Sequence, residues 1–136
     1  MDESLERAVR KRAGYVCEYC GMPQVLYETP FQIEHIIARQ HKGRTSSSNL
    51  ALSCLNCNAS KGPNIAGIDY ATSRTKLVRI FNPRRHKWTR HFHWAGPVLL
   101  GKTPIGRVTI QLLGINDQDR VKVREQLEVE GIFPFR

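Results

Sequence analysis

Acidic residues are nearly absent from the middle of this 136-residue chain. Between His35 and Trp94 there are eleven lysines and arginines but a single acid, Asp69. Residues 1–34 hold four bases and six acids, and residues 95–136 hold six and five, so the middle supplies the whole positive excess of a chain whose formal net charge is +9. A surface this basic attracts polyanions by releasing their condensed counterions. The pattern favours a nucleic-acid partner over its alternative, a solvated basic face without a partner.

The sequence also lacks a long apolar run. No stretch approaches the ~18 apolar residues of a membrane-spanning helix. The N-terminal segment MDESLERAVRK mixes acids and bases without the apolar stretch of a secretory signal. We therefore expect a cytoplasmic protein with no membrane partner. The length suits one domain. The sequence has no recognisable dimerisation motif, so the oligomeric state stays open.

Cysteine is scarce, and the four cysteines form two CxxC pairs: Cys17 with Cys20, and Cys54 with Cys57. The two-residue spacer lets both thiolates of a pair face one ion, at ~2.3 Å in a zinc site. A redox CxxC normally occurs once, and disulfides are rare in the cytosol. The pattern predicts one structural Zn²⁺ bound by all four thiolates.

The segment between the two pairs is longer than in a plain zinc ribbon. It contains 33 residues, against ~15–20 in a ribbon. Its punctuation by proline, glycine and serine indicates a strand at about 31–36, a basic loop at 39–48 and a short element before the second pair. We expect zinc to hold both ends of a β unit that is too short to be stable alone.

Four chemically capable residues follow one another in this segment: Glu34 and His35 in the strand, Asn49 after the loop, and Asn58 directly after Cys57. The order EH, NL, CLNCN resembles the HNH endonucleases over roughly residues 10–62. The resemblance implies an α+β fold with a small zinc-stabilised ββα-metal (His-Me finger) core, flanking helices and a C-terminal arm. We expect a single domain, 1–136, with the core at 10–62 and the basic arm and helices at 63–136.

The resemblance also implies a role for each residue of the motif. His35 would be the general base and Asn49 would orient the loop and the imidazole. Glu34 and Asn58 would be ligands of one catalytic Mg²⁺ or Mn²⁺. Many family members have a second histidine at the position of Asn58, and an amide oxygen suits Mg²⁺ better than zinc. Such an ion would stabilise the phosphorane and the leaving 3′ oxygen.

Each of these residues also has a plainer interpretation. Glu34 could pair at the surface with Arg39 or Lys42, and His35 could hydrogen-bond a carbonyl group. Asn58 could cap a helix, as asparagines often do. Adjacent residues of a strand point to opposite faces, so Glu34 and His35 can act together only if the strand ends or twists there.

Basic residues near the motif suit contacts with phosphate. The candidate DNA-binding residues are Arg39, Lys42, Arg44, Lys61, Arg84 and Arg85, and His41 is a rival for the general base. In PRRHKWTRHFHW, we expect His91 and His93 to share one strand face. We expect this segment to form a DNA-contacting arm in which Trp88, Phe92 and Trp94 pack together.

The chain ends predict helices. Ser4 is the expected N-cap of a first helix that ends at Gly14. Two more helices are expected at 103–115 and 117–130, the last exposed and amphipathic through Val121, Leu127 and Val129.

The sequence as a whole predicts a metal-dependent HNH endonuclease that hydrolyses DNA phosphodiester bonds by nicking or double-strand cleavage. The alternative is a non-catalytic zinc-containing module that binds nucleic acid. The set Glu34, His35, Asn49 and Asn58 favours the enzyme, because a binding module has no chemical need for it.

Overall fold

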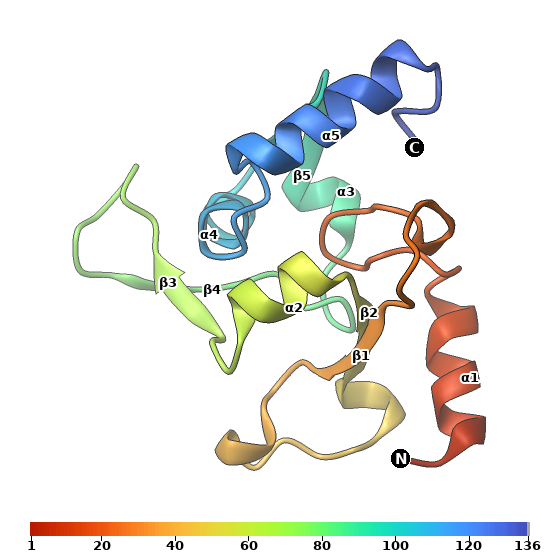
Figure 1. The fold of residues 1–136 in the computed structure, drawn as a ribbon. Helices are drawn as coiled ribbons and strands as arrows, with labels where there is room; N and C mark the ends of the chain where they lie inside the picture. Colours follow the sequence, from red (N-terminus) through yellow and green to blue (C-terminus); the bar gives the residue numbers. More distant parts are fainter. Residues whose placement is uncertain (136) are drawn as a thin grey trace. The chain divides into compact units, whose positions relative to one another are not determined.

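The computed structural model describes residues 1–135, which form two compact units. The first contains Met1–Ile65 together with Asn82–Arg85, and the second contains Ala66–Phe81 and the chain from His86 onward. Figure 1 traces the helices and the short strands along the chain. The strands form three separate two-stranded antiparallel sheets. The expected mixture of helices and short strand pairs is confirmed.

The first unit begins with α1 (Glu3–Arg12). Its N-cap is Asp2, whose carboxylate accepts a hydrogen bond from the Ser4 amide at 2.6 Å. The prediction of Ser4 as the cap was therefore wrong, because the acid two residues earlier already satisfies the free amides of the first turn. Gly14 follows the helix with a φ of +66°, a conformation that ends helices and favours glycine.

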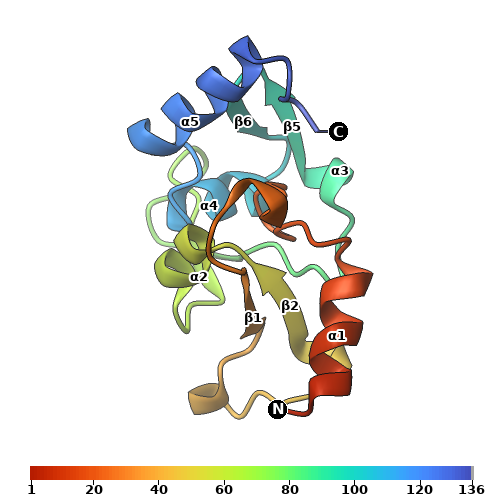
Figure 2. The same ribbon diagram turned by 45° about the vertical axis from the view of Figure 1, so that its right-hand side comes forward.

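The centre of the first unit is the pair β1 (Gln32–His35) and β2 (Leu50–Ser53), which confirms the predicted strand. Glu34 pairs with Ala51 and His35 with Leu50. The helix α2 (Leu55–Lys61) follows β2 directly, which completes a β-β-α arrangement. Figure 2 shows α1 on the β2 side of the pair and α2 on the β1 side. Every residue of β2 is buried as a result.

Three short 3₁₀ turns complete the first unit. They are Gln24–Leu26, Arg39–His41 and Ser47–Asn49; the second lies in the predicted basic loop and the third overlaps its end. Two arginines of α1 fasten this part of the chain. Arg10 donates to the Phe31 carbonyl at 2.8 Å, and Arg12 donates to the Leu50 carbonyl at 2.7 Å.

The second unit contains two hairpins and three helices. The hairpins are β3 (Ala66–Ile68) with β4 (Leu77–Arg79), and β5 (Phe92–Ala95) with β6 (Val98–Gly101). The helices are α3 (Trp88–His91), α4 (Pro104–Leu112) and α5 (Gln118–Val129). The two expected C-terminal helices are confirmed, and α4 packs against β3, β4 and β6.

The last helix, α5, buries a charged residue and exposes apolar ones. Val129 is 81% exposed, whereas Arg124 is 1% exposed. The Arg124 guanidinium donates to the Pro97 carbonyl at 2.6 Å and to the Ile115 carbonyl at 2.8 Å. Hydrogen bonds to backbone carbonyls are what allows an arginine to be buried. The helix is therefore held by Arg124, and the apolar pattern did not predict this.

The expected histidine pair of the arm was wrong. His91 ends α3 and is buried, with Nδ1 2.6 Å from the Thr103 hydroxyl, while His93 lies on β5 and is exposed. The strand begins only at Phe92, so strand alternation does not relate the two side chains. The predicted aromatic packing is confirmed, since the Trp88 ring lies 5.1 Å from Phe92 and 6.2 Å from Trp94.

Among residues 1–135, no helix combines the length and the apolar character needed to cross a membrane.

Candidate active site

The four cysteines converge in the first unit. All four side chains are buried, and their sulfur atoms lie within 4.8 Å of one another. The Sγ atoms of Cys20 and Cys54 are 3.8 Å apart. A tetrahedral zinc with bonds of ~2.3 Å separates its sulfur ligands by about 3.8 Å. The cluster fits a structural zinc, which would join the turn after α1 to the start of α2.

His35 is the last residue of β1, and its imidazole is partly exposed. Its Nε2 lies 2.8 Å from the hydroxyl of Thr45, in the basic loop. Burial lowers the pKa of His35 below 6.5, and the nearby charge of Arg39 lowers it further. Both effects disfavour the protonated ring. The imidazole is therefore neutral near pH 7, as a general base must be.

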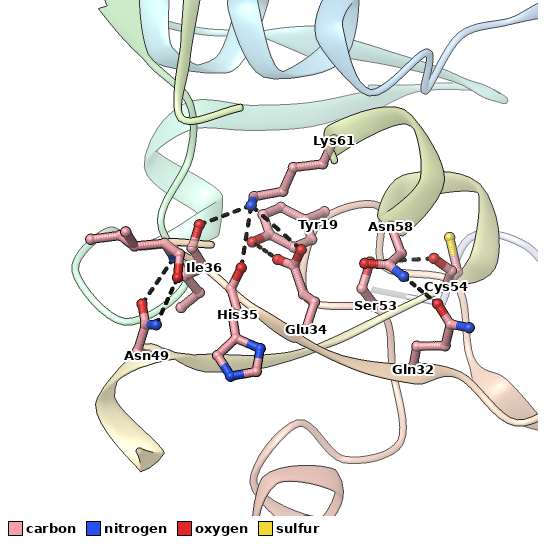
Figure 3. A network of polar contacts seen from close by, with 11 residues as sticks. Tyr19, Gln32, Glu34, His35, Ile36, Asn49, Ser53, Cys54, Asn58 and Lys61 are labelled. Atoms are coloured by element: carbon pink, nitrogen blue, oxygen red, sulfur yellow. Dashed lines mark hydrogen bonds and ion pairs between the residues drawn. The ribbon is translucent and has the colours of Figure 1, made fainter. Parts of the chain in front are cut away.

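Glu34, the neighbour of His35, points to the opposite side of the strand (Figure 3). One carboxylate oxygen accepts a hydrogen bond from the Tyr19 hydroxyl, and the other lies 3.5 Å from Nζ of Lys61. Glu34 is 6% exposed and Lys61 is 1% exposed. Burial raises the pKa of Glu34, although the Lys61 charge opposes this change, and burial also raises the pKa of Tyr19 well above 10.0.

Lys61 lies at the end of α2 and is fully enclosed. Besides the Glu34 carboxylate, its ammonium group contacts the Ile36 carbonyl at 2.8 Å (Figure 3). The expected contact of Lys61 with phosphate does not fit this burial. The alternative interpretation, a surface pair of Glu34 with Arg39 or Lys42, does not fit either, because Glu34 is buried and pairs with Lys61.

The expected ligand pair for a catalytic metal does not fit either. Both oxygens of Glu34 already face Tyr19 and Lys61, and the ammonium group supplies the positive charge that a cation would bring. The Asn58 amide donates to the side-chain oxygen of Gln32. Glu34 and His35 diverge across β1 (Figure 3). These residues therefore offer no shared position for Mg²⁺ or Mn²⁺ beside the imidazole.

Asn49 closes the basic loop at its base. Its side-chain oxygen accepts from the Ile37 amide at 2.9 Å, and its amide donates to the carbonyls of Ile37 at 3.0 Å and Arg44 at 2.9 Å. Figure 3 shows Asn49 with two of these hydrogen bonds as dashed lines. Asn49 therefore positions the loop that carries Thr45. None of these three hydrogen bonds joins Asn49 to the His35 imidazole.

Gly43 is a second requirement of the loop, one that sequence reasoning missed. A Cβ atom at this position would lie 1.7 Å from the Ile37 carbonyl oxygen and 2.9 Å from the Asn49 amide nitrogen. Only glycine leaves room for this approach. The glycine is visible in the sequence, but the closeness of Ile37 depends on how the loop folds back.

The remaining candidate DNA-binding residues fall into two groups. Arg39, Lys42, Arg44 and Arg85 are exposed. Arg84 is mostly buried and forms an ion pair with Glu18 in the first unit. Its guanidinium is thereby held in place by the protein.

Comparison with known proteins connects this site to one family. Residues 17–64 match the family model described as HNH endonuclease. No curated protein and no solved structure matched the chain. The matched segment contains both cysteine pairs, β1, the basic loop, β2 and α2. The similarity to this family thus lies in the segment that holds the cysteine cluster and His35.

Proposed function

We propose that this protein hydrolyses phosphodiester bonds of DNA and that His35 is the general base. The observation that supports this proposal is the position of the imidazole. It is partly exposed at the end of β1, hydrogen-bonded to Thr45, and has a lowered pKa. A neutral imidazole in this setting can take a proton from water.

The contact with Thr45 assigns different tasks to the two ring nitrogens. If Nε2 donates its proton to the Thr45 hydroxyl, Nδ1 is the unprotonated nitrogen. Nδ1 then accepts a proton from a water whose oxygen attacks phosphorus. The bond from phosphorus to the 3′ oxygen breaks, and that oxygen takes a proton from solvent. The products carry a 5′ phosphate and a 3′ hydroxyl group.

Asn49 supports the same step through the loop. By binding Ile37 and Arg44 it holds the segment that presents Thr45 to His35. The exposed Arg39, Lys42, Arg44 and Arg85 supply positive charge for the phosphates of the strand. The four-cysteine cluster would bind zinc as a scaffold, with no part in the reaction.

The expected Mg²⁺ or Mn²⁺ receives no role in this proposal, because Glu34 is committed to Lys61 and Tyr19. The same observation favours the second candidate function, a zinc-containing module that binds nucleic acid without cleaving it. The two candidates differ in one measurable property, which is the cleavage of DNA.

A plasmid-nicking assay separates them. Supercoiled plasmid is incubated with the wild type, His35→Ala and His41→Ala, with Mg²⁺, with Mn²⁺ and without added divalent ions. We expect His35→Ala to nick more slowly than the wild type by roughly 10²–10⁴-fold, as for loss of a general base, and His41→Ala to lose far less activity than His35→Ala. Equal nicking by His35→Ala would refute the assigned base. If all three bind DNA and none nicks it under any condition, the binding module is correct.

A further inference from the structure

The first unit contains a pocket of about 460 Å³ that is separate from the Glu34 network. Two segments far apart in the sequence line it: the basic loop, from Ile37 to Asn49, and the segment Asn82–Arg85. Both segments belong to the same compact unit. Its volume lies in the range of ligand sites, which is ~300–1,000 Å³.

The pocket wall has one sign of charge. Its cationic or ionisable residues are His41, Lys42, Arg44, Arg84 and Arg85, and no acidic residue lines it. The other lining residues contribute hydroxyl or amide groups, a glycine and one isoleucine. The side chains of Lys42, Arg44 and Arg85 have no ion-pair partner within residues 1–135. A concave site with this lining recognises an anion.

Arg84 provides an independent indication of a ligand. Its Nη2 is ion-paired with Glu18, whose other oxygen accepts from the Leu52 amide at 2.9 Å. Its Nη1 is buried and has no hydrogen-bond partner among the described residues. A buried donor left without an acceptor costs ~1–3 kcal/mol. Arg84 also lines the pocket, so an anion bound there would lie against the same incompletely paired guanidinium.

Contacts within the protein already hold the lining residues of the pocket in place. Asn49 binds both Ile37 and Arg44, and Gly43 allows their close approach. The salt bridge of Arg84 fixes the opposite side of the pocket. Such preorganisation lowers the entropy lost on binding.

The basic loop connects the pocket to the proposed base. Thr45, which contacts His35, stands in the chain between Arg44 and Ser46, and both of these residues line the pocket. Residues that line the pocket therefore flank, in the sequence, the group that contacts the imidazole.

From these observations, we infer that the pocket binds a backbone phosphate of the nucleic-acid substrate and thereby places a neighbouring phosphodiester at His35. This inference rests on the proposed function, because it names the part of the site that holds the strand. Arg44 and Arg85 are binding residues, and Arg84 both binds and shapes the wall.

The test measures binding of a short DNA duplex by fluorescence anisotropy over a series of salt concentrations. The His35→Ala chain is used throughout, so that cleavage cannot disturb the measurement. The pocket variant is Arg44→Gln with Arg85→Gln. Its matched control is Arg7→Gln with Lys11→Gln, which removes the same charge from exposed positions on α1.

A second pair of variants changes shape without changing charge. Ser48→Leu places an apolar side chain at the pocket wall, and Ser60→Leu places it at an exposed position on α2. Zinc content and thermal unfolding are measured for every variant to confirm folding. The third arm titrates the wild type and the pocket variant with inorganic phosphate alone.

We expect the pocket variant to bind DNA roughly tenfold more weakly for each lost charged contact. The slope of log K against log salt should fall by about 0.9 for each lost phosphate contact. Ser48→Leu should also bind more weakly, and both controls should bind like the His35→Ala chain. The pocket would be refuted if the pocket variant and its charge control lost equal DNA affinity while Ser48→Leu kept its affinity. Such a result would indicate that DNA binds to a diffuse basic surface.

Two other results would also contradict the inference. Saturable binding of inorganic phosphate that the pocket variant loses, without any loss of DNA affinity, would assign the pocket to free phosphate. If the His35→Ala chain did not bind DNA at all, DNA would be excluded as the ligand of the pocket. None of these readouts depends on cleavage, so the pocket and the general base can fail independently.

Discussion

Lys61 neutralises Glu34 inside the first unit: the two charged groups lie 3.5 Å apart, and both side chains are almost completely buried. The arrangement joins the end of α2 to the centre of β1. Glu34 thus takes part in an interior ion pair, whereas its place in the motif predicted a metal ligand. The relationship has direct consequences for stability.

Replacing Lys61 by methionine should destabilise the protein by about 3–5 kcal/mol, because it leaves a buried carboxylate without a partner. Urea unfolding measures this loss. The control is Lys42→Met, which removes a charge at an exposed position and should change stability by less than about 0.5 kcal/mol. Adding Glu34→Gln to Lys61→Met should recover part of the loss. Additive losses in the double variant would show that the two residues do not interact.

The pH dependence of nicking should report the lowered pKa of His35. Protonation destroys the base, so activity should be constant near pH 7 and fall as the pH drops through a value below 6.5. Arg39→Gln removes one cause of the lowering, so its acidic limb should move toward higher pH. A profile that is flat between pH 5 and 8, with the fold intact by circular dichroism, would exclude a histidine base.

Metal analysis should find about one zinc ion per chain, bound by the four cysteines. Cys54→Ser should lower the zinc content and the thermal stability together, because the cluster joins the turn after α1 to the start of α2. Ser53 is a matched site on the same segment, and Ser53→Ala should keep its zinc. Zinc-free wild-type protein that unfolds at the same temperature as the zinc-bound form would refute the scaffold role.

Gly43→Ala should distort the basic loop, since the added Cβ would collide with the Ile37 carbonyl. We expect slower nicking and weaker DNA binding with unchanged zinc content, because the cysteine cluster lies elsewhere in the unit. Thr45→Ala is the companion variant, which removes the contact with His35 and leaves the loop backbone intact. A Gly43→Ala protein with wild-type binding and nicking would show that the loop conformation is not required.

The sequence by itself indicated the family resemblance, the four clustered cysteines and the main elements of the first unit. These features are encoded locally: a CxxC spacing brings two thiols to one ion, and alternation of polar and apolar residues predicts a strand. The helices before the first pair and at the end of the chain were predicted for the same reason.

Only the tertiary structure decided which groups meet. Glu34 finds Lys61, which lies 27 residues later in the sequence, and His91 finds Thr103 rather than His93. No periodic pattern encodes these contacts, because they depend on how α2 and the hairpins pack. The pocket arises in the same way, since segment 82–85 returns to the first unit after the chain has formed β3 and β4.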